Sequence, residues 1–261
     1  MKITRISLTG ADDKTDISQL QELSLEFPII EWGILFSPTR AGSVRYPSAP
    51  FMEKLVQAQE ESRMHLAAHL CGATMSGFIK DFSSNEPDGA WLEPHGLELS
   101  TFNRTFDRTQ ANFNARRAKF SKETIQNVVR MWPEVMDGVL ITQHHGGNED
   151  VWAWAQEVEQ MCFGAIKAHQ VLHDASGGLG KHAADWNRPF AGLLNGYAGG
   201  LGPDNVVETI LNNEDVVGEG SIWIDMEGSL RGQHDEFDLG ICRQVVERVL
   251  EAGEARGWFF S

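Results

Sequence analysis

The sequence predicts a closed (β/α)8 barrel, an α/β fold in which eight parallel strands alternate with helices. The main observation is an alternation of short apolar or β-branched runs with segments whose apolar residues recur at helical spacing. The length agrees, because 261 residues accommodate eight strand–helix repeats. Residues 1–261 contain no low-complexity linker and no break in composition, so we expect a single domain. An open doubly wound sheet is the alternative topology.

The expected strands are short runs rich in apolar and β-branched residues. In chain order they are Ile3–Thr9, Ile29–Phe36, His65–Leu70, Arg108–Asn112, Gly138–Gln143, Gln170–Asp174, Phe190–Tyr197 and Ser221–Met226. A strand followed by a helix, repeated, requires parallel strands joined by right-handed crossovers, and eight repeats in this length favour closure.

The expected helices lie between most of these strands. They are Ser18–Glu26, Pro50–Arg63, Lys122–Trp132, Glu149–His169, Pro203–Asn212 and Asp238–Glu254. Ser121 is the expected N-cap of the third of these helices. Two connections show no clear helical period: Asp81–Phe106, which is either a lid or an irregular helix, and the glycine-rich segment Gly177–Arg188.

The charge balance excludes two classes of partner. The chain has 22 Lys and Arg against 37 Asp and Glu, a formal charge of −15, which opposes binding to nucleic acid and to anionic membranes. No run approaches the roughly 20 apolar residues of a membrane span, and the first residues lack the apolar core of a signal peptide. We therefore expect a cytoplasmic protein with neither partner. A homodimer stays open.

The cysteines and histidines form no pattern typical of a disulfide framework or a metal site. Cys71, Cys162 and Cys242 are odd in number and far apart, with no C-x-x-C spacing, which favours a reducing compartment. No H-x-H or H-E-x-x-H spacing supports a metal site. We expect no metal and no cofactor.

Glycine-rich turns follow the sixth, seventh and eighth expected strands, where such a barrel places its active site. Glycine lets backbone N–H groups approach an anion closely, and Pro203 and Asp204 suit the first turn of the helix that follows the second of these turns. We expect a small phosphorylated substrate, with its phosphate held at Gly177, Gly178, Gly199, Gly200, Gly228 and Ser229.

Several motifs occur in an order that is typical of one family. The N-terminal ones are Gly33-Ile34-Leu35-Phe36, Gly42-Ser43-Val44-Arg45-Tyr46 and Gln110-Ala111-Asn112. The more specific ones, between Val171 and Arg231, are Leu172-His173-Asp174-Ala175, Gly177-Gly178-Leu179-Gly180-Lys181, Asp185-Trp186, the run Tyr197–Val206 and the run Ile224–Arg231. Together they resemble the phosphoribosylanthranilate isomerases of tryptophan biosynthesis.

The resemblance implies a TIM barrel that opens the ribose ring of an N-linked anthranilate phosphoriboside and rearranges it to a 1-amino-1-deoxyketose. It implies that Asp174 is the acid that protonates the ring oxygen, and that Gln110 and Asn112 bind substrate. Thr9 stands where the family has the cysteine that removes the C2 proton. Arg45 is expected to orient the substrate, since a guanidinium binds a carboxylate through two parallel hydrogen bonds.

The family's base is missing, because a threonine hydroxyl has no useful basicity near neutral pH. The replacement is left open among Asp12, Asp13, His69, Cys71, His144 and His145. Adjacent residues on a strand point in opposite directions, so at most one of His144 and His145 faces the barrel axis. Asp225 and Glu227 have the same strand parity and form another candidate pair for acid/base work, with support of neighbouring backbone by Asp225 as the simpler interpretation.

Two other functions stay open on the same barrel. One is a phosphate-binding enzyme of different chemistry, such as an aldolase, an epimerase or a metal-dependent hydrolase. The other is a non-catalytic protein that binds a phosphoribosyl ligand, which the replacement of the cysteine by Thr9 favours.

Overall fold

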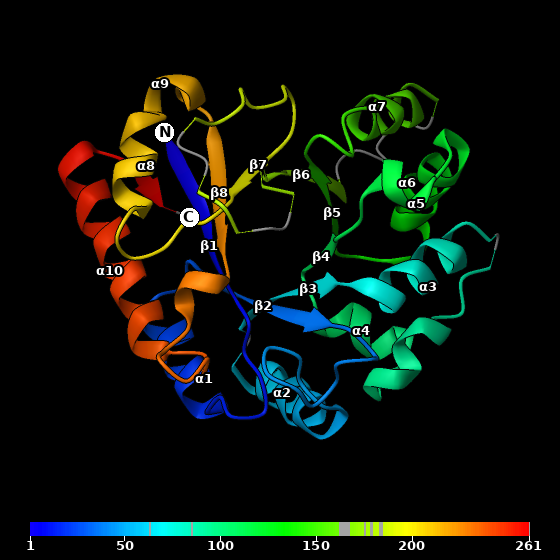
Figure 1. Ribbon diagram of the computed structural model, residues 1–261, viewed down its shortest axis with the longest axis horizontal. Helices are drawn as coiled ribbons and strands as arrows, with labels where there is room; N and C mark the ends of the chain where they lie inside the picture. Colours follow the sequence, from blue (N-terminus) through cyan, green and yellow to red (C-terminus); the bar gives the residue numbers. More distant parts are fainter. Residues whose placement is uncertain are drawn as a thin grey trace.

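Eight parallel strands pair edge to edge and close into a barrel in the computed structural model of the protein (Figure 1). The structure describes residues 1–62, 64–84, 86–161, 168–174, 176–177, 180–182 and 185–260. Strand β1 (Lys2–Thr9) pairs with both β2 (Ile30–Phe36) and β8 (Ser221–Met226), which closes the sheet. The predicted closed barrel is confirmed, and the open sheet is wrong.

The other barrel strands follow one another in chain order around the barrel. They are β3 (His65–Leu70), β4 (Arg108–Ala111), β5 (Val139–His144), β6 (His169–Asp174) and β7 (Asn195–Ala198). A two-residue strand, β9 (Phe259–Phe260), pairs with the first residues of β1, so the two ends of the chain lie side by side (Figure 1).

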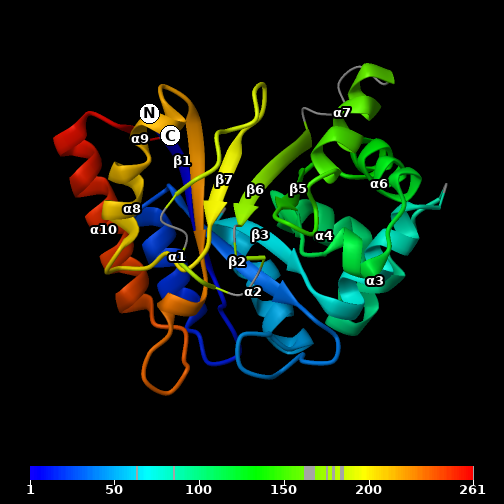
Figure 2. The same cartoon turned by 45° about the horizontal axis from the view of Figure 1, so that its top comes forward.

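Helices surround the strands on the outside of the barrel (Figure 2). The α-helices are α1 (Ile17–Glu26), α2 (Ala49–Ser62), α3 (Gly72–Phe82), α4 (Leu99–Thr105), α5 (Ala115–Ala118), α6 (Lys122–Val135), α7 (Val151–Met161), α8 (Val206–Asn212), α9 (Glu214–Val217) and α10 (Leu239–Arg256), and the 3₁₀ helices are η1 (Ala90–His95) and η3 (Gly228–Leu230). Ser121 caps α6, as expected, by accepting a hydrogen bond from the backbone N–H of Thr124. No described helix is long and apolar enough to cross a bilayer.

The structure moves two predicted boundaries by several residues and resolves one segment that the sequence left open. The seventh strand begins at Asn195, five residues later than expected, because the Asn195 side chain bonds the backbone of Phe190 and closes a turn. His169 pairs with β5 as the first residue of β6, so the helix predicted to reach it is too long. The segment expected at Asp81–Phe106 holds the end of α3, then η1 and α4. Between β6 and β7, the described residues 176–177, 180–182 and 185–194 form no helix.

The strands separate two hydrophobic cores, because successive side chains point to opposite faces. The larger core lies between the strands and the helices and includes aromatic residues in edge-to-face contact, such as Phe78 and Trp132, whose ring centroids are 5.9 Å apart. The smaller core consists of Ile141, Leu172 and Trp223 inside the barrel. The inward-facing side chains of the strands therefore fill the barrel, and those nearest its end form the floor of any cavity there.

A buried ion pair forms part of the barrel interior. Arg108 on β4 donates two parallel hydrogen bonds to Glu31 on β2, with N–O distances of 2.6 and 2.5 Å, and a third to Gln170 at 2.8 Å. The guanidinium also lies over the ring of Trp223, 4.0 Å from its centroid. Burial alone would raise the pKa of Glu31, but Arg108 outweighs burial and holds that pKa below its usual range. The pair is therefore charged and fixed in position.

Four histidines are buried in an uncharged form. Burial lowers the pKa of His69, His95, His169 and His173 to about 4. His169 and His173 lie on β6, where they bond Thr142 and Asn195. Each of these groups must become charged when the protein unfolds in mild acid, which couples stability to pH.

We expect the free energy of unfolding to fall as pH decreases from 6.5 to 4. An unfolded histidine binds a proton near pH 6.5, whereas the folded ones stay neutral to about pH 4, so the unfolded state binds more protons in this window. Each such histidine contributes up to about 3 kcal/mol. Asp225 acts in the opposite direction, because burial raises its pKa to about 7 and the folded chain takes up its proton first. The contribution of Asp225 to the free energy of unfolding offsets that of about one histidine, so the four histidines together still make the protein less stable as pH falls.

Urea unfolding at pH 7, 5.5 and 4.5 measures this effect. The matched variant is His169→Gln, whose amide can still reach Thr142 but does not titrate. It should lose less stability than the native protein between pH 7 and 4.5. An identical loss in the two proteins would show that His169 does not contribute.

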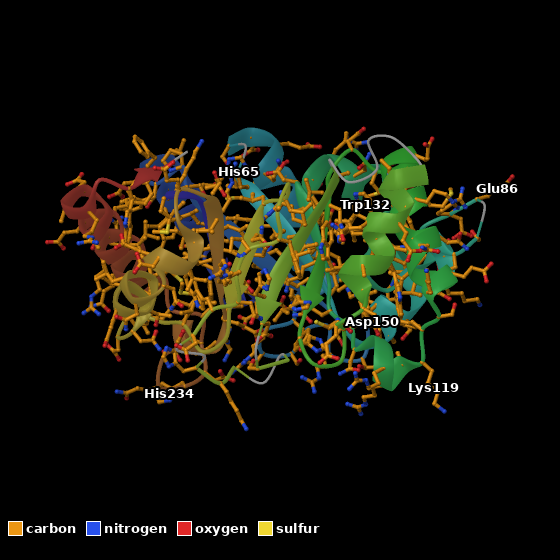
Figure 3. All side chains as sticks on the ribbon, turned by 90° about the horizontal axis from the view of Figure 1, so that it is seen from above. His65, Glu86, Lys119, Trp132, Asp150 and His234 are labelled. Carbon is orange, nitrogen blue, oxygen red and sulfur yellow. The ribbon has the colours of Figure 1, made fainter. Side chains whose placement is uncertain are left out.

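The loops that follow the strands gather at one end of the barrel. In Figure 3, Lys119, Asp150 and His234, from loops after β4, β5 and β8, lie toward one edge of the molecule, and His65, the first residue of β3, lies toward the opposite edge. The carboxyl ends of the parallel strands therefore share one face.

Candidate active site

A cavity of about 660 Å³ opens at the carboxyl ends of the strands. Residues from β2 to β8 and from the loops after them line it, from Leu35 on β2 to Asp225 on β8. Active sites of (β/α)8 enzymes lie at this end of the barrel.

Most of the residues predicted for the site lie together around this cavity. Those that line it are Arg45, Gln110, Asn112, Asp174, Gly177, Gly199, Gly200, Gly228 and Ser229. Thr9 is completely buried and contacts the lining residue Asp225. Gly178 lies outside the described residues.

Asp225, near the end of β8, is a carboxyl group that titrates near neutral pH. The Thr9 hydroxyl donates a hydrogen bond of 3.0 Å to its Oδ1. Burial raises the pKa of Asp225 to about 7, and the Glu31 carboxylate adds to the rise while the bond from Thr9 opposes it. A carboxyl group of this kind can both accept and return a proton at physiological pH. A carboxyl group that can exchange a proton near neutral pH therefore lies directly beside Thr9.

His69 on β3 is held as a neutral imidazole. Burial lowers its pKa to about 4. The Gln110 amide nitrogen lies 3.3 Å from Nδ1 and can only donate, so the ring proton is on Nε2. His69 is thus a hydrogen-bond donor at the cavity and not a base.

Gly33 on β2 allows His69 and Thr9 to approach each other. A Cβ atom at this position would lie 2.0 Å from Oγ1 of Thr9 and 3.0 Å from Nε2 of His69. Only glycine leaves room for both side chains. Asp225, Thr9 and His69 consequently form a contiguous polar group across strands β8, β1, β2 and β3.

Asp174, at the end of β6, lines the cavity and also holds the following turn. Its Oδ1 accepts hydrogen bonds from the backbone N–H of Ser176 at 3.0 Å and from the Ser176 hydroxyl at 2.6 Å. These bonds fix the direction of the carboxyl group. Its assignment as the acid stays a prediction.

Arg45 lies at the cavity with its guanidinium already paired. Its two terminal nitrogens are each 3.1 Å from a carboxylate, one of Glu227 and one of Asp235, and its backbone N–H bonds Asp12. A substrate carboxylate would have to displace these partners. The predicted clamp on the substrate stays a prediction. Arg40 lies over the ring of Tyr46, 5.3 Å from its centroid.

The cysteine and histidine candidates for the missing base are poorly suited to it. Burial raises the pKa of Cys71 to about 11, so its thiolate is scarce near neutral pH. His144 packs outside the barrel, with its ring 5.4 Å from His173 and 5.0 Å from Phe190. His145 lines the cavity, but its Nδ1 accepts a hydrogen bond from the backbone of the loop that follows it.

The two aspartates after β1 hold loops together. Asp12 accepts hydrogen bonds from Arg231 at 3.1 Å and from the Arg45 backbone at 2.8 Å. Asp13 accepts one from the Ser48 backbone at 2.8 Å. Both connect the loops after β1 and β2, which leaves Asp225 as the best-placed base.

The loops after β6, β7 and β8 touch one another at the glycine turns. Gly200 has a φ of +62°, and a Cβ atom there would lie 2.5 Å from the backbone nitrogen of His182. The Ser229 hydroxyl donates to the backbone oxygen of Leu201. Gly199, Gly200, Gly228 and Ser229 all line the cavity at this junction, and Gly199 and Gly200 have φ values of +112° and +62°. An anionic ligand in this part of the cavity would therefore lie close to their backbone.

The expected helix N-terminus is not part of this junction. Helix α8 begins only at Val206 and has 7 residues, so Pro203 and Asp204 precede it and do not form its first turn. An anion at this junction would therefore contact the backbone of the glycine turns and not the N-terminus of α8.

Asp225 was expected to support neighbouring backbone, but the structure places it at the cavity, and Gln143 and Asn114, which lie at the ends of expected strands, also line the cavity. The available signal was strand parity. Ser7 on β1 pairs in register with Asp225 on β8, and Thr9, two residues further along β1, points to the same face, so inward positions of adjacent strands meet. Among the described residues, no three or more His, Cys, Asp or Glu side chains are arranged to hold a metal ion.

Comparison with known proteins supports the fold. No protein-family model and no curated protein sequence matches the chain. The phospho-2-dehydro-3-deoxyheptonate aldolase (DAHP synthase) of Thermotoga maritima superposes with a TM-score of 0.56 at 12% identity, over 100% of this chain and 71% of that one. A monomeric form of the dimeric phosphoribosylanthranilate isomerase of the same organism superposes with a TM-score of 0.52 at 14% identity, over 94% of this chain and 97% of that one. At these identities the likeness is one of fold.

Proposed function

We propose that the protein isomerises a small phosphorylated sugar derivative by acid/base catalysis. The observation that carries the proposal is the presence of two carboxyl groups, Asp174 and Asp225, around one cavity that the glycine turns also line. An isomerisation that moves a carbonyl along a sugar needs one group to donate a proton and one to remove it. The two groups lie on β6 and β8, so a ligand between them is reached by both.

The reaction uses the residues in two steps. Asp174 gives a proton to the ring oxygen as the bond between that oxygen and C1 breaks, and it takes back a proton from the C1 hydroxyl, which becomes the aldehyde carbonyl of the open sugar. Asp225 then takes the proton from C2. The electron pair of that bond forms a C1–C2 double bond while the carbonyl pair moves to O1, which receives a proton from Asp174 to give the enediol. The Nε2–H of His69 stabilises the charge that develops on the neighbouring oxygen, as neutral donors in a site closed to water do best. Asp225 then returns its proton to C1 while the C2 hydroxyl gives its proton back to Asp174 and becomes the ketone carbonyl, which completes the isomerisation and restores both carboxyl groups.

The phosphate of the substrate binds at the glycine turns. The backbone of Gly199, Gly200, Gly228 and Ser229, which lines the cavity, supplies N–H hydrogen bonds without a charged side chain. This suits a cavity that is otherwise lined by the carboxylates of Asp174, Asp225 and Glu227.

Gly200→Ala should weaken the binding of ribose 5-phosphate and of inorganic phosphate by at least about ten-fold. Alanine is strained at a φ of +62°, and its Cβ would push the loop after β6 away from the junction. The matched control is Gly218→Ala, which has a φ of +63° but nothing within 4 Å of the added carbon. Titration followed by ³¹P NMR measures both variants. If a folded Gly200→Ala variant binds both ligands with the native affinity, the phosphate does not bind at the glycine turns.

A further inference from the structure

The cavity has two chemically different halves. The glycine turns and Asp174 come from β6 to β8. The opposite half comes from the ends of β3 to β5, and four carboxamide side chains line it together with His69: Gln110, Asn112, Asn114 and Gln143. A carboxamide presents both a donor and an acceptor and carries no charge.

The carboxamide half has no lysine or arginine among its described residues. Among the described residues that line the cavity, Arg45 is the only Lys or Arg, and Glu227 and Asp235 hold its guanidinium. His69 is neutral, because burial lowers its pKa to about 4. A carboxylate placed in this half would lose its hydration without gaining an opposite charge, which is costly.

Gln110 presents an acceptor that the protein itself does not use. The residue is 2% exposed, and its amide nitrogen donates to Asn112 at 2.9 Å and to His69 at 3.3 Å. Its Oε1 is buried and has no hydrogen-bond partner among the described residues. Leaving a buried oxygen unpaired is unfavourable, and a ligand O–H or N–H would supply the missing hydrogen bond.

We propose that this half binds the uncharged, hydroxyl-bearing end of the substrate, so that the substrate is a polyhydroxy sugar phosphate without an aromatic acid. The inference rests on the proposed function, since it names the class of phosphorylated sugar. Vicinal hydroxyls match carboxamides, because each hydroxyl also donates and accepts. A benzoate ring in the same place would leave the amide groups unpaired and its carboxylate without a cation. The proposal therefore replaces the anthranilate that the sequence resemblance implies with a hydroxyl-bearing end group.

Two stable ligands test the inference on the native protein. Ribitol 5-phosphate and 1-(2-carboxyphenylamino)-1-deoxyribitol 5-phosphate share the phosphate and the chain and differ only at C1. Calorimetry should find ribitol 5-phosphate bound at least about ten-fold more tightly, a difference of about 1.4 kcal/mol. Inorganic phosphate serves as the common reference.

Gln110→Met then tests the residue. It should weaken ribitol 5-phosphate by about five-fold or more and leave inorganic phosphate unchanged, whereas Gln126→Met, on the outer helix α6, should change neither. Tighter binding of the carboxyphenyl ligand by the native protein would overturn the inference and leave the proposed function intact. Failure of inorganic phosphate and both sugar ligands to bind would overturn the proposed function as well. The comparison of ligands needs no variant, so it stands even where Gln110→Met does not fold.

Discussion

Asp225→Asn should slow the exchange of the sugar's C2 proton with solvent by about 10²–10⁴-fold, the usual contribution of a positioned general base. Asparagine keeps the shape of the side chain and can still accept the hydrogen bond from Thr9, but it cannot take a proton. The affinity for ribose 5-phosphate should not decrease. Proton NMR in D₂O gives the exchange rate, and calorimetry gives the affinity.

Thr9→Val tests whether the hydrogen bond from Thr9 sets the pKa of Asp225, as distinct from the proton transfer that Asp225 itself carries out. The hydrogen bond from Thr9 lowers the pKa of Asp225, so removing it should raise that pKa. The base acts in its ionised form, and the rise of exchange rate with pH should therefore move to higher pH in this variant. Loss of exchange in Asp225→Asn without any movement of the pH profile in Thr9→Val would mean that Thr9 only packs against the carboxyl group.

Arg108→Met should lower the free energy of unfolding by about 3–5 kcal/mol, because it leaves a charged group unpaired inside the barrel. Its partner Glu31 is 1% exposed and loses two direct hydrogen bonds. Trp223 also loses the guanidinium over its ring. Urea unfolding at pH 7 measures the change.

Two controls test whether the loss of stability comes from an unpaired buried charge: a double variant and an exposed ion pair. Glu31→Leu combined with Arg108→Met removes both charges and should recover most of the loss. Arg116→Met breaks an ion pair with Glu149 whose side chains are 70% and 61% exposed, and should cost less than about 1 kcal/mol. Equal losses at Arg108 and Arg116 would contradict a dominant role for burial.

The fold could be predicted because its strands are short apolar runs separated by helical periods. Strand β3 at His65–Leu70 and strand β8 at Ser221–Met226 match the predicted bounds, and β1 begins one residue earlier than expected. The prediction failed where a side chain overrides the apolar pattern. The Asn195 side chain bonds the backbone of Phe190, and β7 begins only at Asn195. His169 continues the helical spacing of the residues before it, but it pairs with β5 in the sheet.

The cavity lining could be predicted in part, because residues at strand ends must meet at one face of a barrel. The interactions that decide the chemistry could not. Thr9 bonds Asp225 across 216 residues of sequence, and Arg108 bonds Glu31 across 77. Burial then sets the pKa of Asp225, and no local pattern in the chain gives the burial of one carboxyl group.

The central claim is that Asp225 removes a proton from a phosphorylated sugar bound in the cavity. The most direct test is to incubate the native protein with ribose 5-phosphate or ribulose 5-phosphate in D₂O at pH 7.5 and to follow the carbon-bound hydrogens next to the carbonyl by proton NMR. We predict deuterium incorporation at that carbon above the buffer rate, and its loss in Asp225→Asn. Saturating binding of these sugar phosphates with no incorporation above buffer would contradict the claim and identify the cavity as a binding site without this chemistry.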